Sequence, residues 1–452
     1  MSVHIVILAA GQGTRMKSAL PKVLHPIAGK PMVQHVVDVA RTLGEAITLV
    51  VGHGADAVKA QFAGQSVHFV TQHEQLGTGH AVAQALPHIQ ASDRVLVLYA
   101  DVPLLQHHVL LPMVAAEHHQ ALTILTAQLD DPTGYGRIVR QGEHIQAIVE
   151  QKDATAEQLA ISEVNTGIMA MTGEHLHRWL PKLGNNNAQG EYYLTDLVAM
   201  AVADDVPVNA VKAQDVISTQ GVNNRVQLAE LEREYQRRQA EALMLAGVTV
   251  LDPQRLDIRG TVSSGQDTLI DVNVILENVT LGANVTIGAN CILRDCRIGD
   301  GAVILDNTLI EDADIGSNAN VGPFARIRPG TVLEAGAKVG NFVEIKKAHI
   351  GAGAKVNHLT YIGDARIGAK ANIGAGTITC NYDGVNKYIT DIGAGAFIGS
   401  NSTLVAPVTI GDGGYIGAGS VISKDAPAEQ LTLARSRQVT IAKWQRPSKK
   451  ES

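Results

Sequence analysis

The second half of the chain repeats an aliphatic residue every six positions, and a glycine often follows it. The clearest run contains Ile392, Ile398, Leu404, Ile410, Ile416 and Ile422, and a second run contains Val321, Ile327, Leu333, Val339 and Ile345. A period of six fits neither the alternation of an ordinary strand nor the period of a helix. It fits a short strand and a corner, repeated so that each aliphatic side chain points toward one axis. The sequence therefore predicts a parallel β-helix with three strands per coil.

Glycine and aromatic content support this prediction. Of the 44 glycines, 17 precede residue 226 and 24 lie between Gly282 and Gly419, where they suit the corners of a coil. Aromatic residues make up only 4% of the chain, as expected if stacked Ile, Val, Leu and Ala fill a narrow interior. A chain of 452 residues is long enough for two or three domains. We therefore expect an α/β domain over 1–225, a linker helix over 226–247 and a β-helix over 248–452.

Apolar runs bounded by turn residues alternate with helical patterns through the first half. Two segments, 32–43 and 77–86, have helical patterns. Five runs predict buried strands, at 4–10, 47–52, 67–72, 94–101 and 122–129. This alternation predicts a Rossmann-like, mostly parallel sheet covered by helices, whose ligands bind at the carboxyl ends of the strands.

The segment after the first predicted strand has features of a phosphate-binding loop. Gly11 and Gly13 allow the backbone to curl close to a ligand, and Arg15 and Lys22 supply positive charge. The segment matches neither the Rossmann fingerprint nor the Walker A loop, so an ordinary strand-to-helix turn is an alternative. Asp101 ends a predicted strand, where it is placed either to hold Mg²⁺ or to cap a helix.

The string LAAGQGTRM(x)5PK, from Leu8 to Lys22, resembles the signature of the sugar-phosphate nucleotidyltransferases, which make nucleotide sugars. Further motifs follow in that family's order, including GTG at 77–79, YAD at 99–101, GYGR at 134–137, NTG at 165–167 and GVNNR at 221–225. The similarity continues through the second half. The whole chain resembles the family of bacterial bifunctional enzymes, pyrophosphorylase and glucosamine-1-phosphate N-acetyltransferase, that make UDP-N-acetylglucosamine.

This resemblance implies a uridylyltransferase site in the first domain, with UTP as substrate and Mg²⁺ as cofactor. Arg15 and Lys22 would act in catalysis by stabilising the phosphates, and Asp101 and Asn223 would be the metal ligands. The implied UTP and sugar contacts are Leu8, Ala9, Ala10, Gly11, Gly13, Lys22, Gln72, Gly77, Thr78, Tyr99, Ala100, Asp101, Gly136, Glu150, Asn165 and Asn223. Of these, Gln72, Gly77 and Thr78 would contact the uracil, and Gly136, Glu150 and Asn165 the sugar. Ala100 stands where relatives are expected to carry glycine, and its added methyl could shift the loop.

A second group of polar residues lies on the predicted β-helix. At about 18 residues per coil, Arg328, Lys346 and residues 363–364 stack on adjoining turns, and basic residues stacked in this way make a phosphate site. His358 lies close by and outside the inward aliphatic phase. Its titration range suits the base that acetyl transfer to an amine needs, although a surface histidine without function is an alternative. The segment 380–391 interrupts the repeat and is expected to project from the coil.

A further resemblance, to the hexapeptide acyltransferases, implies a left-handed β-helix and trimers with active sites between chains. His358 would be the base that deprotonates glucosamine-1-phosphate, and the co-substrate would be acetyl-CoA. The amino-sugar phosphate would be held by Arg328, Lys346, Tyr361, Asn372 and, from an adjacent subunit, Lys387. The acetyl-CoA groove would be lined by Ala375, Asn381, Tyr382, Ser400, Ala418 and Arg435.

The chain is therefore expected to acetylate glucosamine-1-phosphate and then to transfer UMP from UTP to the product. Two alternatives are a nucleotidyltransferase with an inert β-helix and a β-helical scaffold without activity. The net charge of −7 offers no general attraction to nucleic acid or an anionic membrane, and the first apolar run is too short to span a bilayer. Three cysteines outside any CxxC motif are expected to be reduced, as in a cytoplasmic protein.

Overall fold

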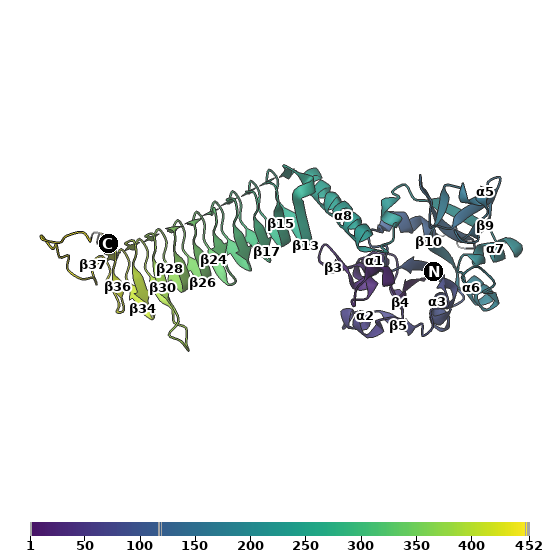
Figure 1. Cartoon of the computed structure of the whole chain (residues 1–452), viewed down its shortest axis with the longest axis horizontal. Coiled ribbons are helices and arrows are strands. Elements are labelled where there is room, and N and C mark those ends of the chain that lie inside the picture. The colour runs from purple at the N-terminus through teal and green to yellow at the C-terminus, as the bar shows by residue number, and fades with distance from the viewer. Residues whose placement is uncertain (1, 116–117, 119, 448, 450–452) are drawn as a thin grey trace. The chain divides into compact units, whose positions relative to one another are not determined.

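The computed structural model describes residues 2–115, 118, 120–447 and 449. The chain divides into two compact units, Met1–Tyr235 and Gln236–Ser452, whose elements are labelled in Figure 1. Within the described part of the chain, no helix combines the length and apolar character that crossing a membrane requires.

The first unit is built on one nine-stranded sheet. Strands β1, β4, β5 and β6 run parallel, and β10 lies antiparallel between β6 and β7. The main order is β11-β7-β10-β6-β1-β4-β5, and the hairpin β8–β9 pairs with β10. The strands are β1 (Val3–Ala9), β4 (Ala46–Val51), β5 (His68–Thr71), β6 (Arg94–Tyr99), β7 (Leu122–Gln128), β8 (Arg137–Gln141), β9 (His144–Val149), β10 (Glu163–Thr172) and β11 (Val208–Lys212).

The predicted α/β architecture is confirmed. All five predicted strands and both predicted helices are present, and their ends lie within two residues of the prediction. The predicted burial is wrong for β5, whose residues are exposed or partly exposed because it is the edge strand of the sheet. The helices of this unit are α1 (Met32–Arg41), α2 (Ala55–Gln61), α3 (Thr78–Ala85), α4 (His107–Leu110), α5 (Ala156–Leu159), α6 (Gly173–Trp179) and α7 (Asp196–Ala203). Strands β8 to β11 were not predicted, so the antiparallel part of the sheet is a finding of the structure.

Strand β1 is almost wholly apolar, with His4 as its one polar residue, because helices cover both of its faces. Ile5 and Ile7 pack in one cluster with Val36 of α1, whereas Val6 and Leu8 pack in another with residues of α3. Alternate side chains of a strand point to opposite faces, so both sets are buried. The strand is thereby held at the centre of the sheet, with its carboxyl end leading into the loop that begins at Ala10.

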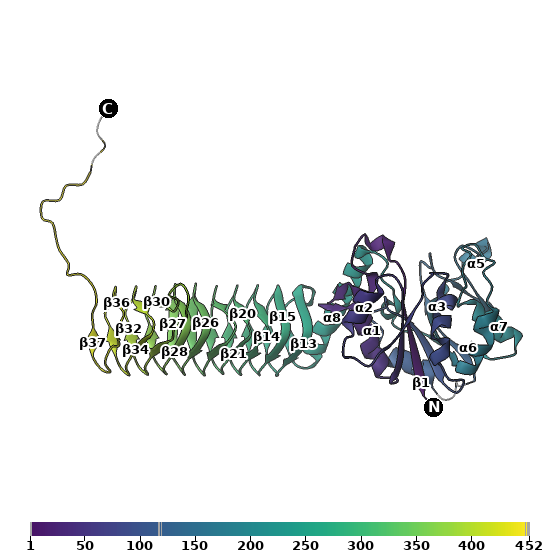
Figure 2. The same ribbon diagram turned by 90° about the horizontal axis from the view of Figure 1, so that it is seen from below.

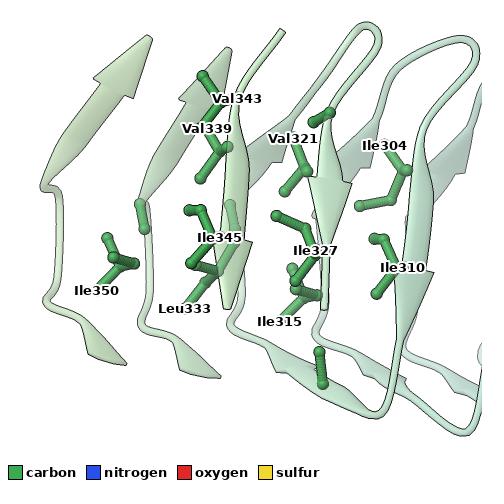
Figure 3. Close-up of a cluster of buried hydrophobic side chains, with 14 of the residues drawn as sticks. Ile304, Ile310, Ile315, Val321, Ile327, Leu333, Val339, Val343, Ile345 and Ile350 are labelled. Carbon is green, nitrogen blue, oxygen red and sulfur yellow. The ribbon is translucent and has the colours of Figure 1, made fainter. Parts of the chain in front are cut away.

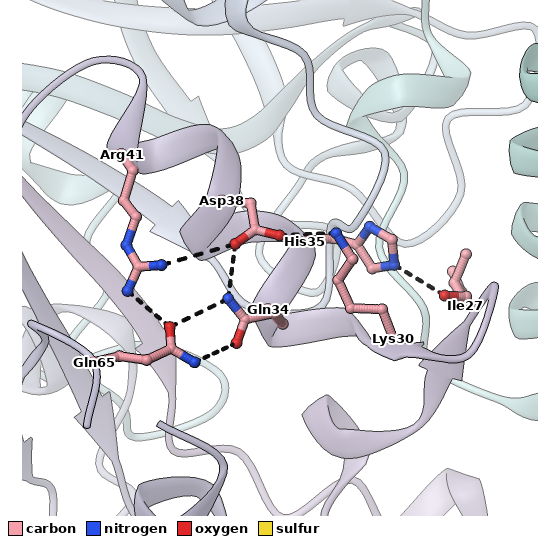
Figure 4. A network of polar contacts seen from close by, with 7 residues as sticks. All are labelled: Ile27, Lys30, Gln34, His35, Asp38, Arg41 and Gln65. Carbon is pink, nitrogen blue, oxygen red and sulfur yellow. Dashed lines mark hydrogen bonds and ion pairs between the residues drawn. The ribbon is translucent and has the colours of Figure 1, made fainter. Parts of the chain in front are cut away.

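A polar network holds the segment between Lys22 and helix α1 (Figure 4). Asp38 accepts hydrogen bonds from Lys30 Nζ at 2.8 Å and Gln34 Nε2 at 2.7 Å, and His35 Nε2 donates to the Ile27 carbonyl at 2.9 Å. Ile27 and Lys30 belong to the short hairpin of β2 (Pro26–Ile27) and β3 (Lys30–Pro31). Because this hairpin follows Lys22 in the chain, the network fixes the segment that carries the predicted phosphate-binding lysine.

The second unit is a parallel β-helix, whose stacked coils are seen from below in Figure 2. Ile304 pairs with Val321, Val321 with Val339, and Val339 with Val356, so these three coils contain 17, 18 and 17 residues. The coil is thus slightly shorter than the predicted average of about 18. The parallel strands and the six-residue repeat are consistent with the left-handed parallel β-helix that the resemblance implied.

Two parallel sheets make up this unit. One has eleven strands: β12 (Thr249–Val250), β14 (Leu269–Ile270), β16 (Thr286–Ile287), β19 (Val303–Ile304), β22 (Asn320–Val321), β25 (Lys338–Asn341), β27 (Lys355–His358), β29 (Asn372–Ile373), β32 (Phe397–Ile398), β35 (Tyr415–Ile416) and β37 (Leu431–Thr432). The other has fifteen strands: β13 (Leu256–Ser264), β15 (Val274–Leu281), β17 (Ile292–Arg294), β18 (Arg297–Ile298), β20 (Leu309–Glu311), β21 (Ala313–Ile315), β23 (Arg326–Ile327), β24 (Thr331–Leu333), β26 (Glu344–Ile350), β28 (Tyr361–Ile367), β30 (Ile378–Cys380), β31 (Thr390–Ile392), β33 (Thr403–Val405), β34 (Val408–Ile410) and β36 (Val421–Ile422).

The repeated aliphatic residues fill the interior of the coil, as predicted. Every residue of the two predicted runs is at most 3% exposed, and Figure 3 shows part of this inward stack. Two of the three cysteines lie in the same interior, where burial raises the pKa of Cys291 to about 11 and that of Cys296 to about 12. These thiols are therefore protonated at neutral pH. All three cysteines are free.

The predicted interruption of the repeat is a projecting loop between β30 and β31 (Figure 1). Ile367 of one coil pairs with Ile392, which is 25 positions later in the chain, and the next step returns to 18. The loop is closed by a bridge between Tyr382 and Lys387.

Helix α8 (Arg225–Leu245) lies where the linker helix was predicted. Its residue Leu231 is 2% exposed and packs in a small apolar cluster of the first unit. Gln236 belongs to the second unit, where its side chain donates to the Ile258 carbonyl at 2.9 Å and accepts from the Ile258 amide at 2.6 Å. Each end of the helix is therefore anchored within its own unit.

Candidate active sites

A cavity of about 270 Å³ lies at the carboxyl ends of β1 and β6. This is the position at which parallel sheets of this type bind ligands. Gln75 and Glu191 line the cavity and were not predicted. Ten predicted UTP and sugar contacts also line it: Leu8, Ala9, Ala10, Gly11, Lys22, Gln72, Gly77, Thr78, Tyr99 and Asp101.

The loop after β1 has the backbone form of a phosphate-binding loop. Gly13 has a φ of 61°, and a Cβ at this position would lie 2.6 Å from the Cβ of Lys22, so only glycine fits. A Cβ on Gly11 would meet no atom within 4 Å, which leaves the backbone beside the cavity open to a ligand. Met16 is 1% exposed and packs with Val222, which anchors the far end of the loop.

Two cations of this site are each paired with one of the two predicted metal ligands. Lys22 Nζ lies 2.5 Å from Asp101 Oδ2, and Arg15 Nη2 donates to Asn223 Oδ1 at 2.8 Å. The Val222 amide donates to the Asp101 carbonyl at 2.9 Å, which holds the segment of Asn223 next to Asp101. The predicted phosphate-binding and metal-binding residues therefore form one group.

The donor set of this group suits Mg²⁺. A carboxylate oxygen of Asp101 and an amide oxygen of Asn223 are the hard ligands that this ion prefers, and it commonly takes one or two protein ligands and completes its shell with phosphate and water. Within the described residues, no group of three or more His, Cys, Asp or Glu side chains is spaced to hold a metal ion. A site that uses only two protein ligands agrees with both observations.

The predicted uracil contacts are held rigidly at one edge of the cavity. Gln72 is 3% exposed, and its Nε2 donates to the Gly77 carbonyl at 3.1 Å. Gly77 has a φ of 107°, and a Cβ there would lie 2.6 Å from the Tyr192 carbonyl oxygen, so this position requires glycine. Thr78 Oγ1 accepts a hydrogen bond from the Leu194 amide at 3.1 Å.

The predicted sugar contacts come together, but beside the first cavity and not in its wall. The Asn165 amide donates to the Gly136 carbonyl at 2.9 Å, and Glu150 accepts from Thr195 Oγ1 at 3.1 Å. Glu150 lines a second cavity of about 360 Å³, together with Asp153. Burial raises the pKa of Glu150 above its ordinary value, and the carboxylates nearby add to this effect, whereas the Thr195 hydrogen bond opposes it.

Ala100, which stands where glycine was expected, has its side chain in the core of the first unit. The residue is fully buried, and its side chain belongs to the apolar cluster beneath the sheet. Its amide donates to the Leu8 carbonyl at 3.0 Å, which continues the pairing of β6 with β1. The methyl group therefore packs in the core, and Ala100 is not among the residues that line the cavity.

Three cations gather on one face of the β-helix. Ile327 pairs with Ile345, which places Arg328 beside Lys346 on the next coil, and Lys346 in turn pairs with Gly363. The Lys387 ammonium group beside Lys346 lowers the pKa of Lys346, and repulsion from Arg328 adds to the effect. An anion bound among these side chains would relieve their mutual repulsion, so the group suits a phosphate.

Lys387 was expected to reach this site from an adjacent subunit. The structure places the chain's own Lys387, from the projecting loop, next to Lys346. Glu344 was not predicted, although its Oε1 lies 2.7 Å from Arg328 Nη1 and orients this guanidinium. A single chain thus assembles the three cations.

His358 lies at the end of β27 with its side chain exposed. Its Nδ1 lies 3.0 Å from Oδ1 of Asn341, a residue that was not predicted. Its carbonyl accepts hydrogen bonds from Thr360 Oγ1 at 2.6 Å and from the Gly376 amide at 3.2 Å. The backbone of the histidine is therefore fixed while the ring faces solvent, as a base that meets a diffusing substrate requires.

Three of the predicted acetyl-CoA contacts form a ladder of small residues along one corner of the coil. The Asn401 amide donates to the Ala375 carbonyl at 2.7 Å, and the Gly419 amide donates to the Ser400 carbonyl at 2.8 Å, so Ala375, Ser400 and Ala418 lie on successive coils. Arg435 Nη1 donates to the Ala418 carbonyl at 2.8 Å at the end of the ladder.

The other predicted contacts of this site lie on and beside the projecting loop. Asn381 is 7% exposed and donates to the Asp364 carboxylate, whereas Tyr382 is 58% exposed and donates to the Gly384 carbonyl. Tyr361 lies on β28, with its hydroxyl over Gly363. Asn372 lies on β29 opposite Lys355.

The two β-helix residues that sequence reasoning missed share one signal. Asn341 precedes His358 by 17 positions, and Glu344 is two positions before Lys346, which lies opposite Arg328 on the next coil. Both become visible only when the length of each individual coil is known, because the partner of a side chain changes with every residue added to or removed from the turn.

Matches to known domain families follow the division of the chain. Residues 5–164 match the MobA-like NTP transferase domain. Residues 258–339 match the GMPPB C-terminal domain, and residues 390–424 match the bacterial transferase hexapeptide family with six repeats. A nucleotidyltransferase-type domain is therefore followed by hexapeptide repeats.

Several curated proteins resemble the chain along its whole length. The bifunctional protein GlmU of Stutzerimonas stutzeri (strain A1501) is 58% identical and covers 100% of both chains. The proteins of the same name from Marinobacter nauticus and Cellvibrio japonicus are 58% and 57% identical, and cover 99% of this chain and 99% and 100% of their own. Among solved structures, a putative glucose-1-phosphate thymidylyltransferase from Bacillus anthracis matches with a TM-score of 0.41 and 20% identity, over 51% of this chain and 94% of that one.

Proposed function

The chain belongs to the GlmU family of bifunctional proteins, and we propose that it makes UDP-N-acetylglucosamine in two steps. The second unit transfers an acetyl group from acetyl-CoA to the amine of glucosamine-1-phosphate. The first unit then transfers UMP from UTP to N-acetylglucosamine-1-phosphate and releases pyrophosphate. The observation that carries this proposal is that each unit assembles a polar site of its own: the cavity of Lys22 and Asp101 in one, and the cation group beside His358 in the other.

Uridylyl transfer is an in-line displacement at the α-phosphorus of UTP, so the enzyme must position the reactants and stabilise negative charge. The open backbone at Gly11 meets the phosphates, and Arg15 and Lys22 neutralise their charge. Asp101 and Asn223 would hold Mg²⁺, which supplies further neutralisation of the phosphates when it is bound. Gln72, Gly77 and Thr78 hold the uracil, and Gly136, Glu150 and Asn165 hold the sugar.

Acetyl transfer joins the amine nitrogen to the acetyl carbon and breaks the thioester bond, and coenzyme A leaves as its thiolate. Nε2 of His358 takes the proton that the amine gives up as it attacks. Arg328, Lys346 and Lys387 bind the sugar phosphate, and Tyr361 and Asn372 bind other groups of the same substrate. Acetyl-CoA lies along the groove of Ala375, Asn381, Tyr382, Ser400, Ala418 and Arg435.

The same proposal includes the domain boundaries, the assembly and the compartment. Residues 1–225 form the uridylyltransferase domain, 226–247 the linker helix and 248–452 the acetyltransferase domain. The enzyme is a homotrimer whose β-helices associate, which is supported by exposed apolar side chains such as Phe324 and Phe342 on the coil. The free cysteines support a reducing compartment, the cytoplasm. The substrates are small molecules, and nucleic acid is not a partner.

Two substitutions in the full-length protein test the division of labour. His358→Ala should abolish acetyl transfer and leave uridylyl transfer intact, whereas Asp101→Ala should do the reverse. Equal loss of both reactions in either variant would contradict two independent sites. Full acetyl transfer by His358→Ala would favour another base. In the unaltered protein, uridylyl transfer without acetyl transfer would favour an inert β-helix, and the absence of both reactions would favour a scaffold.

A further inference from the structure

We propose that Asn341 is a positioning residue for acetyl transfer, which selects the tautomer and the orientation of His358. This inference rests on the proposed acetyltransferase function. Asn341 Oδ1 lies 3.0 Å from His358 Nδ1, so the Nδ1–H group donates to the amide oxygen and Nε2 carries the lone pair. The nitrogen that the contact leaves free is the one that takes the proton of the substrate amine.

The register of the β-helix makes Asn341 the polar partner of His358. Strands β25 and β27 pair in parallel, with Asn341 opposite His358. The same register places Pro323 one coil before this pair and Ala375 one coil after it, and neither side chain has a hydrogen-bonding group. The ladder to which His358 belongs therefore offers the imidazole one polar side chain, that of Asn341.

The backbone on the Asn341 side of the contact is tightly constrained. A Cβ on the preceding Gly340 would clash with the Asn357 carbonyl oxygen, so the two coils approach each other closely here. The Asn341 carbonyl accepts from the Leu359 amide at 3.1 Å. The following residue, Phe342, has a φ of 56° and stacks on Phe324 with ring centroids 5.4 Å apart. The amide oxygen is thus presented by a fixed backbone.

This contact solves a problem that an exposed histidine has. A neutral imidazole in water favours the tautomer with hydrogen on Nε2, in which that nitrogen cannot accept a proton. An acceptor at Nδ1 reverses the preference and also prevents rotation of the ring. Because the acceptor is an uncharged amide, it does so without the negative charge of a carboxylate, which would favour the imidazolium and remove the free base.

Asn341→Leu and Asn341→Asp test this role in the full-length enzyme. Leucine keeps the approximate shape of the side chain and removes the acceptor, so kcat for acetyl transfer should fall about 10- to 100-fold, by analogy with the loss of a partner that orients a metal-bound imidazole. The KM values for both substrates and the rate of uridylyl transfer should change little. Asn341→Asp restores the acceptor but adds charge, so the acidic limb of the pH–rate profile should move to higher pH, with recovery of activity there.

The other titratable groups near the pair are the same in every variant. On the strands packed with β27 they are Lys338 of β25 and Lys355 of β27 itself, and β29 contributes none. The neighbouring face adds Glu344 and Lys346 on β26, with Arg328 and Lys387 beside them. Differences between the pH profiles of the variants therefore report on position 341 alone.

Asn320→Leu, the same substitution on β22 of the same sheet, is the matched control and should behave as the unaltered enzyme. Unchanged kcat in Asn341→Leu, or a profile of Asn341→Asp that is not shifted, would overturn the positioning role. If Asn341→Leu fails to fold, the shift in Asn341→Asp decides the question. Retention of acetyl transfer by His358→Ala would instead overturn the proposed base, and the inference with it.

Discussion

Replacing Lys22 with methionine is expected to strengthen the binding of Mg²⁺ to the nucleotide-free enzyme. Lys22 Nζ lies 2.5 Å from Asp101 Oδ2, and the two side chains are only 14% and 19% exposed. A metal ion that binds Asp101 must therefore displace an ammonium group from the same carboxylate. A hydrogen bond to a charged group contributes about 1.5–3 kcal/mol. Its removal should tighten metal binding by about 10- to 150-fold, because 1.4 kcal/mol corresponds to a factor of ten.

The measurement is a calorimetric titration of MgCl₂ into the nucleotide-free protein, repeated with UTP in the presence of EDTA. The affinity for UTP should change in the opposite direction, because Lys22 supplies charge to the phosphates. Lys30→Met is the matched control, since it breaks a similar pair with Asp38 at 2.8 Å outside the cavity and should leave both affinities unchanged. Magnesium binding to Lys22→Met that is equal to or weaker than that of the unaltered protein would refute the reasoning.

Three further substitutions test burial and backbone strain. Burial raises the pKa of Glu150, so the folded state binds more protons than the unfolded state, and the stability that this proton contributes is lost as pH rises through the folded pKa. Glu150→Gln should therefore raise Tm at pH 7 and have no such effect at low pH. An equal or lower Tm at pH 7 would contradict this. Gly77→Ala should lower the free energy of unfolding, measured in urea, by about 1–3 kcal/mol because of the positive φ of Gly77 and the nearby Tyr192 carbonyl. Gly64 also has a positive φ, but a Cβ there meets no atom within 4 Å, so Gly64→Ala measures the effect of φ alone. Ile345→Ala, in the coil interior, should lower the free energy of unfolding by about 2–5 kcal/mol. Val332, which is 39% exposed, is the control, and Val332→Ala should lower it by less than about 1 kcal/mol. Equal losses in the two variants would argue against the inward stack.

The β-helix could be predicted almost completely because its pattern is local. Each of the eleven predicted inward positions, such as Ile345 and Ile416, is buried, since a six-residue spacing returns the chain to the same interior. The number of residues in each coil, in contrast, cannot be read from this local pattern. Val321 to Val339 spans 18 residues and Val339 to Val356 spans 17, and the aliphatic pattern alone does not separate these two values. This is why Asn341 escaped prediction although its partner His358 did not.

In the first unit, most of the parallel strands could be predicted from the sequence but the antiparallel strand β10 could not. Its buried parallel strands were predicted because both faces are covered and the runs are mostly apolar, as in β1, where His4 is the one polar residue. The antiparallel strand β10 follows a hairpin, and its neighbours β6 and β7 are distant in sequence, so no short pattern reveals where it is inserted. The prediction placed Ala100 inside a strand over 94–101, whereas β6 ends at Tyr99, and the direction of its methyl group depends on pairing with Leu8, which the sequence does not disclose.

In the β-helix, insertions within a strand and insertions at a corner have different effects on the site, and this explains where the projecting loop lies. In a parallel ladder, side chains on adjacent coils lie about 4.8 Å apart, so Arg328, Lys346 and Gly363 form one group only while each coil keeps its register. Extra residues within a strand would turn these side chains inward. Extra residues at a corner leave the register intact: the chain makes a step of 25 from Ile367 to Ile392, and Ile373 still pairs with Ile398. The corner after β30 is therefore a place where the fold accepts a loop without loss of stacking, and the loop inserted there carries Lys387 to Lys346. The β-helix thus supplies repeated, evenly spaced positions for substrate groups, and its corners supply the irregular segments that complete the site.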